Sequence, residues 1–225
     1  MTSIMWSWSR MARYTGHNQR VEIADGRTNM AKDAELLFAA EAGAAGWRVY
    51  RWDGPWVSLG RFQRAERAVV AGWERWCVRP TGGRAVLHGH DLTLAYALPH
   101  DGDCRQIKEV YRRLIAPLVE ALNACGLECQ LAETTRYVGR GRESEDCFAF
   151  RSPNDVVCPD TGKKVCGCAL RISERGALLQ ASVPHGAPLV EPGEAIVGAT
   201  RMSPSRWDAD GFLGAVSAAM SSRGL

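Results

Sequence analysis

One cysteine lies in a context that suits nucleophilic chemistry. Cys147 is followed by Phe148 and comes directly after a polar segment, residues 134–146, that is rich in Gly and Arg. A thiolate is a potent nucleophile, but a cysteine with an unperturbed pKa of about 8.5 is mostly protonated near neutral pH. The thiol therefore needs a base or a nearby cation to activate it, and the sequence leaves both His88 and Lys164 open as candidates.

A pair of lysines follows a glycine in a segment typical of a β-hairpin. Gly162 and Lys163 lie in the turn, and alternation along the next strand places Lys164 on the face opposite Lys163. If that face packs against the protein, the ammonium of Lys164 is buried and needs a functional partner. The alternative is a pair of solvated hairpin lysines.

A double glycine joins two extended segments upstream. Gly82 and Gly83 lie in the stretch that runs from Arg79 to His88. Adjacent glycines let the backbone approach a ligand closely, and their N–H groups can bind an anion or a carbonyl oxygen. An ordinary Gly-Gly hairpin turn is the alternative, and the spacing alone favours it.

The remaining cysteines predict neither disulfides nor a metal site. No apolar export signal opens the sequence, so we expect the reducing cytoplasm, where structural disulfides are rare. The spacings lack the paired C-x2-C and H-x3-H patterns of zinc sites, so we expect no metal. The cysteines that we expect to be reduced and structural are Cys77, Cys104, Cys125, Cys129, Cys158, Cys166 and Cys168.

Length and composition are those of an ordinary globular protein. The chain has 225 residues, of which 46% are hydrophobic and 24% charged. A chain of this length can bury a large core without disulfides or a structural metal ion. A net charge of +3 with scattered basic residues argues against a nucleic-acid partner. No stretch reaches the roughly 18 apolar residues of a membrane span. We expect a single domain over residues 1–225.

Hydrophobic periodicity predicts strands in neighbouring pairs and a few helices. The predicted helices cover residues 30–42, 63–72, 105–124 and 207–221. We expect Asn29 as the N-cap of the first and a kink or a break at Pro117 in the third. The predicted strands cover residues 47–52 and 56–62, as a hairpin-like unit, and 84–88, 92–98, 127–131, 155–158, 164–172 and 178–183. We expect an α/β (α+β) fold in which helices pack on a mixed, largely antiparallel sheet.

In their order along the chain, several of these segments resemble the lipoyl/biotin protein ligase family. The resemblance covers about residues 29 to 183, and it is closest to the octanoyltransferase branch that uses a cysteine. The segments are NMAKDAELL, RWDGPWVSLGRFQ, RPTGGRAVLHGHDLTLAYALP, CF, NDVV, GKKVCGCALR and LLQ. The combination of RPTGGRAVLH with a later CF and GKK is the specific part.

The resemblance implies both an architecture and an activity. The architecture is a central mixed sheet flanked by helices, akin to the catalytic domains of biotin ligases and class II aminoacyl-tRNA synthetases. The activity is transfer of an octanoyl group from acyl carrier protein to a lysine of a lipoyl domain, such as the H protein of glycine cleavage. The thioester donor is already activated and Cys147 would carry the acyl group, so we expect no cofactor.

The resemblance also assigns roles to individual positions. Cys147 matches the nucleophile and Lys164 the characteristic pocket lysine, which we expect to stabilise the oxyanion together with backbone N–H groups. The positions expected to bind the substrate are Arg79, Thr81, Gly82, Gly83, Val86, His88, Asp155, Gly167 and Ala169. Leu87 and Val165 are further candidates for the apolar wall of an acyl tunnel.

Two stretches depart from the family pattern. Family members commonly have Ser-Ala-Gln where this chain has Cys168, Ala169 and Leu170, and Leu-Gln-His-Gly-Ser where it has residues 179–183. Three other functions therefore stay open. They are an amidotransferase that moves acyl groups between lipoyl domains, an ATP-dependent lipoate ligase, and a non-catalytic module that keeps the acyl pocket.

Overall fold

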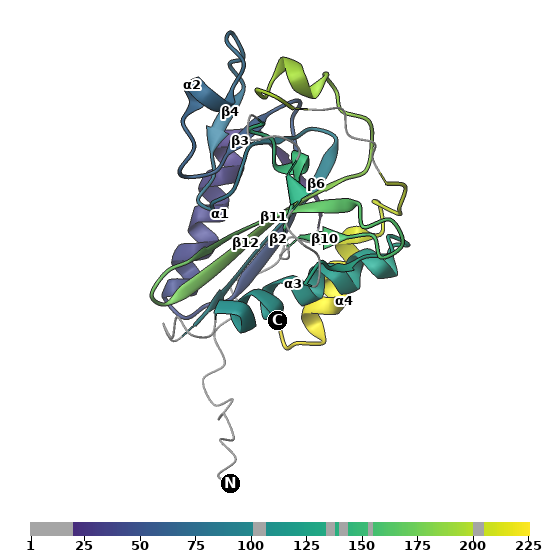
Figure 1. Ribbon diagram of the computed structural model, residues 1–225. Helices are drawn as coiled ribbons and strands as arrows, with labels where there is room; N and C mark the ends of the chain where they lie inside the picture. The colour runs from purple at the N-terminus through teal and green to yellow at the C-terminus, as the bar shows by residue number, and fades with distance from the viewer. Residues whose placement is uncertain (1–19, 101–106, 134–137, 140–143, 153–154, 200–204) are drawn as a thin grey trace.

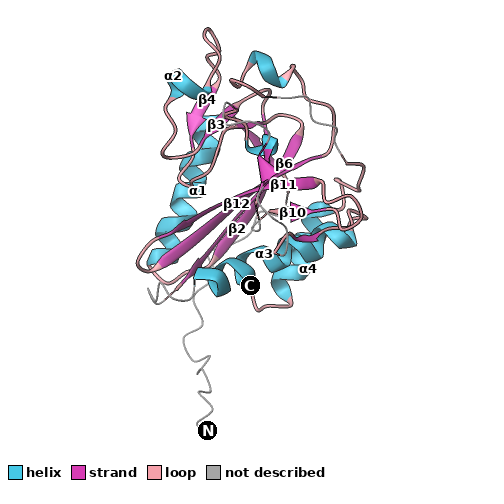
Figure 2. Ribbon diagram, in the orientation of Figure 1, coloured by secondary structure: helices cyan, strands magenta, loops and turns pink. Residues whose placement is uncertain are grey.

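A seven-stranded sheet runs through the middle of the molecule, with helices on both faces (Figures 1 and 2). The computed structural model describes residues 20–100, 107–133, 138–139, 144–152, 155–199 and 205–225. Across the sheet the strands are β1 (Glu22–Ala24), β2 (Gly46–Trp52), β6 (Asp91–Pro99), β12 (Gly176–Pro184), β11 (Lys164–Ile172), β10 (Val156–Val157) and β7 (Gln130–Leu131). The pair β1 and β2 is parallel, and the other neighbours are antiparallel. The predicted fold class, a mixed and largely antiparallel sheet flanked by helices, is confirmed.

Two smaller sheets complete the strand structure. The first has the order β4 (Trp76–Val78), β3 (Val57–Leu59) and β5 (Val86–Leu87), and the second pairs β8 (Val138–Gly139) with β9 (Phe150–Arg151). The predicted hairpin of residues 47–52 and 56–62 is wrong. Both edges of β2 are already occupied, by β1 and by β6, so β3 finds its partners in a separate sheet.

The first long helix covers one face of the large sheet. Helix α1 (Gly26–Glu41) begins earlier than predicted, because the Asp25 carboxylate accepts hydrogen bonds from the Arg27 and Thr28 N–H groups, at 2.8 and 3.0 Å. The predicted cap at Asn29 is wrong, since this side chain is buried and donates to the carbonyl groups of Ala24 and Arg51.

Helices α3 (Ile107–Ala124) and α4 (Phe212–Ser221) cover the opposite face. Helix α3 runs unbroken through Pro117, so of the kink or break expected there the break is wrong. Pro117 is buried in the helix face that packs on the core. Tertiary packing of this strongly amphipathic helix outweighs the local cost of a proline. The short elements are α2 (Ala65–Ala68), η2 (Cys147–Ala149) and η3 (Pro192–Glu194).

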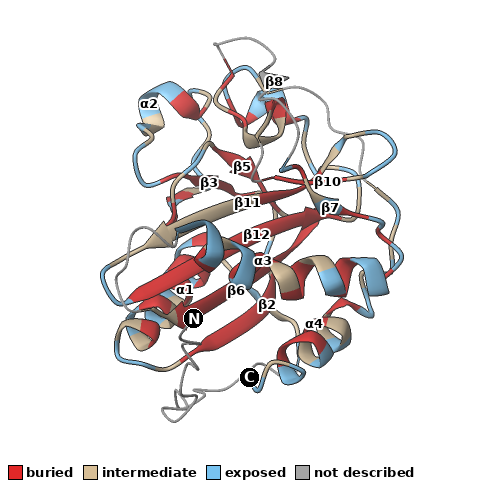
Figure 3. Ribbon diagram, turned by 60° about the horizontal axis from the view of Figure 1, so that its bottom comes forward, coloured by how far each residue is buried: buried red, intermediate tan, exposed pale blue. Residues whose placement is uncertain are grey.

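The hydrophobic core is divided by the large sheet, in which β2, β6 and β12 are almost entirely buried, whereas most of β11 is partly exposed (Figure 3). Alternation along β2 shows the division, since Trp47 and Val49 pack with α3 and α4, whereas Tyr50 and Trp52 pack with α1. No helix in the described segments has the length and apolar character needed to cross a bilayer.

Candidate active site

Cys147 is the first residue of the short helix η2, where several hydrogen bonds fix its backbone. Its N–H donates to the Ala85 carbonyl at 2.8 Å, which ties it to the segment that follows the double glycine. The Asp146 carboxylate caps η2 by accepting from the Phe148 N–H at 3.0 Å. Burial raises the pKa of Asp146 to about 6, against the opposing effects of the Phe148 hydrogen bond and of Lys164.

Lys164, the first residue of β11, lies against Cys147. Its Nζ is 3.3 Å from the Cys147 Sγ, donates to the carbonyl groups of Cys147 and Phe150 at 3.0 and 3.4 Å, and pairs with Asp155 at 2.9 Å. The Lys164 side chain is only 8% exposed, which decides between the two interpretations of the lysine pair in favour of a buried ammonium. Burial opposes the charge, but Cys147 and Asp155 outweigh it and raise the pKa of Lys164, so the ammonium stays charged.

A hollow of about 320 Å³ opens beside the Cys147 thiol. Of the predicted site residues it is lined by Arg79, Val86, His88, Cys147, Gly167 and Ala169. Lining residues that were not predicted are Met30, Tyr50, Trp52, Ser58, Thr93, Cys168, Gln180, Ala181 and Ser182.

The remaining predicted positions lie around this hollow without lining it. Asp155 holds Lys164, and Thr81 is buried against Gln180. Leu87 instead lines a second hollow, of about 270 Å³, and Val165 belongs to the core beneath α3, so neither forms the wall of the first hollow.

The double-glycine loop is folded onto the buried guanidinium of Arg79. Arg79 Nη2 donates to the carbonyl groups of Gly82 and Arg84 at 2.6 and 2.7 Å, and Nη1 donates to Ser58 O at 2.9 Å. Gly83 has φ +88°, and a side chain there would meet the Arg79 guanidinium at 2.9 Å. The loop therefore needs glycine at position 83 for both conformation and space.

His88 lies in a buried chain of hydrogen bonds that uses both of its ring nitrogens. Nδ1 is 2.7 Å from the Asp91 carboxylate, and Nε2 is 2.8 Å from the Ser58 hydroxyl. Burial opposes the ionisation of Asp91, but His88 outweighs it and lowers the pKa of Asp91. Of the two candidates for activating Cys147, Lys164 contacts the sulfur, whereas His88 is held by Ser58 and Asp91.

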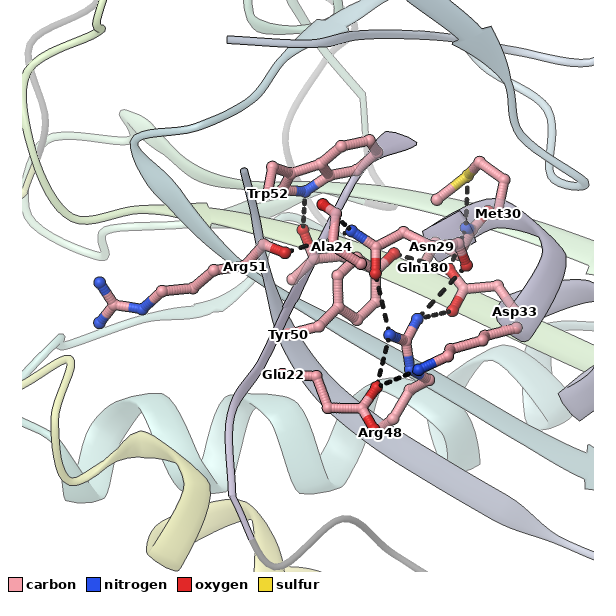
Figure 4. Close-up of polar contacts among 12 residues, drawn as sticks. Glu22, Ala24, Asn29, Met30, Asp33, Arg48, Tyr50, Arg51, Trp52 and Gln180 are labelled. Carbon is pink, nitrogen blue, oxygen red and sulfur yellow. Dashed lines mark hydrogen bonds and ion pairs between the residues drawn. The ribbon is translucent and has the colours of Figure 1, made fainter. Parts of the chain in front are cut away.

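A second buried polar network lies behind the hollow, between α1 and β2 (Figure 4). Arg48 Nη1 donates to Asp33 Oδ1 at 2.8 Å, and the Tyr50 hydroxyl donates to Asp33 Oδ2 at 2.6 Å. Gln180 Nε2 also donates to Asp33 Oδ2 at 2.6 Å, while its Oε1 accepts from the Thr81 hydroxyl at 2.6 Å. The network thus reaches from α1 to the loop that carries the double glycine.

The sequence analysis missed this network, although a signal for it is present. Asp33 lies at helical spacing among Met30, Leu37 and Ala40, which form the buried face of α1. A carboxylate in an apolar stripe is rarely buried without a partner. That partner, Arg48, lies on β2, and the sequence around Asp33 does not predict it.

The other cysteines in the described segments have no disulfide partners and differ in burial. Cys77, Cys125, Cys129 and Cys166 are buried, and burial raises the pKa of Cys77 and of Cys129 to about 12. Such thiols are unreactive, as expected for structural cysteines. Cys104 lies outside the described residues. Within the described ranges, no three His, Cys, Asp or Glu side chains are grouped so that they could hold a metal ion.

The large sheet and the hollow together define a fold of the lipoate-ligase type. A solved structure of lipoate-protein ligase A bound with ATP superposes with a TM-score of 0.72 at 21% sequence identity, over 94% of this chain and 85% of that one. Residues 25–200 match the family model described as the lipoyl protein ligase A/B catalytic domain. The chain belongs to this family.

Relatives of known name resemble the chain over most of its length. It is 34% identical to an octanoyltransferase LipM from Kyrpidia tusciae over 176 residues, covering 72% of this chain and 61% of the relative. It is also 34% identical to an octanoyltransferase LipM from Carboxydothermus hydrogenoformans, covering 74% of this chain and 61% of the relative. The chain thus spans about three fifths of the length of these relatives.

Proposed function

We propose that this chain transfers an octanoyl group from an acyl carrier protein thioester to a lysine of a lipoyl domain, such as the glycine cleavage H protein, through a Cys147 acyl-enzyme. One observation carries the proposal. The Lys164 ammonium lies 3.3 Å from the Cys147 sulfur, at the edge of a hollow of about 320 Å³, in a chain 34% identical to named octanoyltransferases.

The chemistry requires two balanced steps and no ATP. The Cys147 thiolate attacks the carbonyl carbon of the donor thioester, a new C–S bond forms, and the carrier leaves as a thiol with the proton lost by Cys147. The acceptor amine then attacks the Cys147 thioester, an amide forms, and the amine proton returns to the Cys147 sulfur. Lys164 is positioned to stabilise negative charge on sulfur and on the oxyanion in each step. The substrate is itself a thioester, so we propose no cofactor.

The lining of the hollow suits an alkyl chain. Met30, Trp52, Val86, Ala169 and Ala181 supply apolar surface. The polar side chains that line the hollow already have hydrogen-bond partners within the protein, so an alkyl chain would not leave them without partners. They are Tyr50, Ser58, Arg79, His88, Thr93, Gln180 and Ser182.

The residues that depart from the common family pattern lie in the wall of the hollow, and the contact between Cys147 and Lys164 is kept. Ala181 and Ser182, which stand where His-Gly is common, line the hollow, and Ser182 donates to Asp91 at 2.5 Å. Cys147 and Lys164 remain in contact, which favours an enzyme over a non-catalytic module. We further propose a cytoplasmic location, where reducing conditions keep the Cys147 thiol available.

The test is a mass measurement of the intact chain after incubation with octanoyl-acyl carrier protein, without ATP. We expect a hydroxylamine-sensitive octanoyl adduct that is lost in Cys147→Ala and retained in Cys158→Ala, whose thiol is also partly exposed. Labelling of a lipoyl domain that needs ATP and survives Cys147→Ala would replace the proposal with a ligase. Adduct formation from an octanoyl-lipoyl domain alone would indicate an amidotransferase. If the chain gives neither adduct nor labelling, the non-catalytic module is favoured.

A further inference from the structure

An exposed basic and aromatic surface lies beside the candidate active site. We define the basic-aromatic patch as Arg61, Phe62, Arg64 and Arg67, on the turn after β3 and on α2. The Phe62 side chain is 81% exposed, and the Arg61 guanidinium lies 4.7 Å from the centre of its ring. In the described part of the chain, no carboxylate forms an ion pair with these three arginines, although Glu66 is exposed on the same helix.

The patch is attached to the double-glycine loop. The Arg61 N–H donates to the Thr81 carbonyl at 2.9 Å. Gly60 packs so closely on this loop that a Cβ there would lie 2.0 Å from the Gly83 carbonyl oxygen. Gly83 is itself exposed, and it lies beside Ala169 of the hollow. The double-glycine loop therefore lies between the patch and the hollow, with its exposed side next to the patch.

The patch is also attached to the segment that carries Cys147. Gln63, in the middle of the patch, donates from Nε2 to the Glu145 carboxylate at 2.7 Å, two residues before Cys147. The Val197 N–H donates to the Ala68 carbonyl at the end of α2, and the Glu145 N–H donates to the Val197 carbonyl, both at 3.0 Å. A protein held on this patch would thus be held next to the Cys147 segment.

From this placement we infer that the basic-aromatic patch docks the donor of the acyl group, an acidic carrier protein that presents its thioester on a flexible arm. This inference rests on the proposed function. A carrier must be held within reach of Cys147 while its arm enters the hollow, and the patch lies at that position. Exposed arginines that pair with no carboxylate of the described residues attract an acidic surface and raise its rate of encounter, and an exposed aromatic ring provides an anchor. A small thioester needs no such docking.

The test compares two donors in the first half-reaction, acylation of Cys147 followed by intact mass. The donors are octanoyl-acyl carrier protein and the octanoyl thioester of N-acetylcysteamine. The patch variant reverses three charges, Arg61→Glu, Arg64→Glu and Arg67→Glu. The matched control reverses three exposed charges elsewhere, Lys108→Glu and Arg113→Glu on α3 and Arg175→Glu at the far end of β11 from Lys164.

With the carrier donor we expect the patch variant to lose at least about tenfold in kcat/KM and most of its salt dependence. We expect the control to stay within about twofold, and Phe62→Ala to lose less than the patch variant. With the small thioester, all variants should match the parent. The inference is overturned if the patch variant acylates normally from the carrier, or if it slows equally with both donors. It is also overturned if only the later transfer to a lipoyl domain slows.

If the parent chain is acylated by neither donor, the proposed function is contradicted, but the docking role of the patch is still testable. Binding of the unacylated carrier protein, measured in the same buffers, then tests whether the patch docks the carrier. Weaker binding in the patch variant alone supports docking there, and equal binding by parent, patch variant and control overturns it.

Discussion

At the scale of the residue, the site depends on one buried cation that has several partners. Lys164 contacts the thiol and carbonyl of Cys147, the carbonyl of Phe150 and the carboxylate of Asp155. The Asp155 carboxylate also accepts from the Ser152 N–H at 2.6 Å, so its position is fixed. Asp155, which was expected to bind substrate, does not line the hollow, and its contact with the ammonium favours a role in positioning Lys164 and keeping it charged.

Lys164→Ala should lower the rate of octanoyl transfer by about 10²–10³-fold, since it removes a fixed charge beside the reacting atoms. The adjacent Lys163→Ala is the matched control, because Lys163 is exposed, and it should stay within about twofold. Single-turnover acylation and aminolysis rates are the measurement. Normal turnover in Lys164→Ala would refute the role.

A loss of fold would complicate that result, because Asp155 would be left buried without its cation. The double variant Asp155→Asn/Lys164→Met removes both charges and should recover thermal stability relative to Lys164→Met, while remaining inactive. Recovery of activity together with stability would mean that Lys164 supports the fold rather than the chemistry.

The candidate pair Cys147 and Lys164 was predictable from sequence, and the bond that holds His88 from another strand was not. Cys147 and Lys164 stand in motifs whose order resembles a known family, so both were singled out. His88 follows β5 and bonds to Ser58 of β3, 30 residues away in sequence, and no local pattern encodes this bond. From sequence, His88 is therefore a candidate for activating the thiol, whereas in the structure both of its ring nitrogens are hydrogen-bonded to other side chains.

At the scale of the element, the double-glycine loop is held from behind by Gln180 of β12. Gln180 accepts from Thr81 in the loop and donates to Asp33 of α1, so one amide joins a strand, a loop and a helix. Burial raises the pKa of Asp33, and Arg48, Tyr50 and Gln180 oppose this effect. The loop is therefore coupled to a network that includes a buried ion pair.

We expect this coupling to appear in a double-mutant cycle. Gln180→Met keeps the side-chain volume and loses the hydrogen bonds to Thr81 and Asp33, and Thr81→Val loses the first of these two bonds from the other side. Each should lower the free energy of unfolding by about 1–3 kcal/mol, with a coupling energy of about 0.5–1.5 kcal/mol between them. Both should also raise the KM for the octanoyl donor more than they change kcat. Strict additivity of the two stability changes in urea denaturation would contradict a direct bond.

Element positions were predictable where the elements are long, and element partners were not. The strands β6, β11 and β12 lie close to their predicted ranges because each is a largely apolar stretch of nine residues. The pairing of β3 was mispredicted because β2 takes β1, a strand of three residues, as its second neighbour. A strand that short has no periodicity to read.

At the scale of the whole molecule, the site is assembled from segments that are distant in sequence. Strand β12 lies between β6 and β11, which brings Thr93, Gly167 and Ser182 into register on one surface of the sheet. The Cys147 segment is joined to Ala85 on one side and to Val197 on the other. Global unfolding should therefore separate all parts of the site at once. The free energy of unfolding of the whole chain then includes the cost of burying the charged side chains of the site.

Asp146 makes that stability depend on pH. Its pKa rises from an ordinary 3.8 to about 6 in the folded chain, chiefly through burial, so between these values the folded state binds a proton that the unfolded state does not. The contribution of Asp146 to the free energy of unfolding thus falls as pH rises from about 4 to about 6. At about 1.4 kcal/mol per pKa unit, the loss is at most about 3 kcal/mol.

Asp146→Asn removes this titration and keeps the side-chain oxygen that caps η2 through the Phe148 N–H. The variant should therefore gain stability relative to the parent as pH rises, by about 2 kcal/mol between pH 4.5 and 7. His90, whose pKa burial lowers, acts in the opposite direction in both proteins and cancels in the difference. Urea denaturation at pH 4.5, 5.5 and 7 measures the difference, and high salt should leave it largely unchanged because burial is its cause. A difference that is flat across this range would show that the Asp146 carboxylate is solvated in the folded chain.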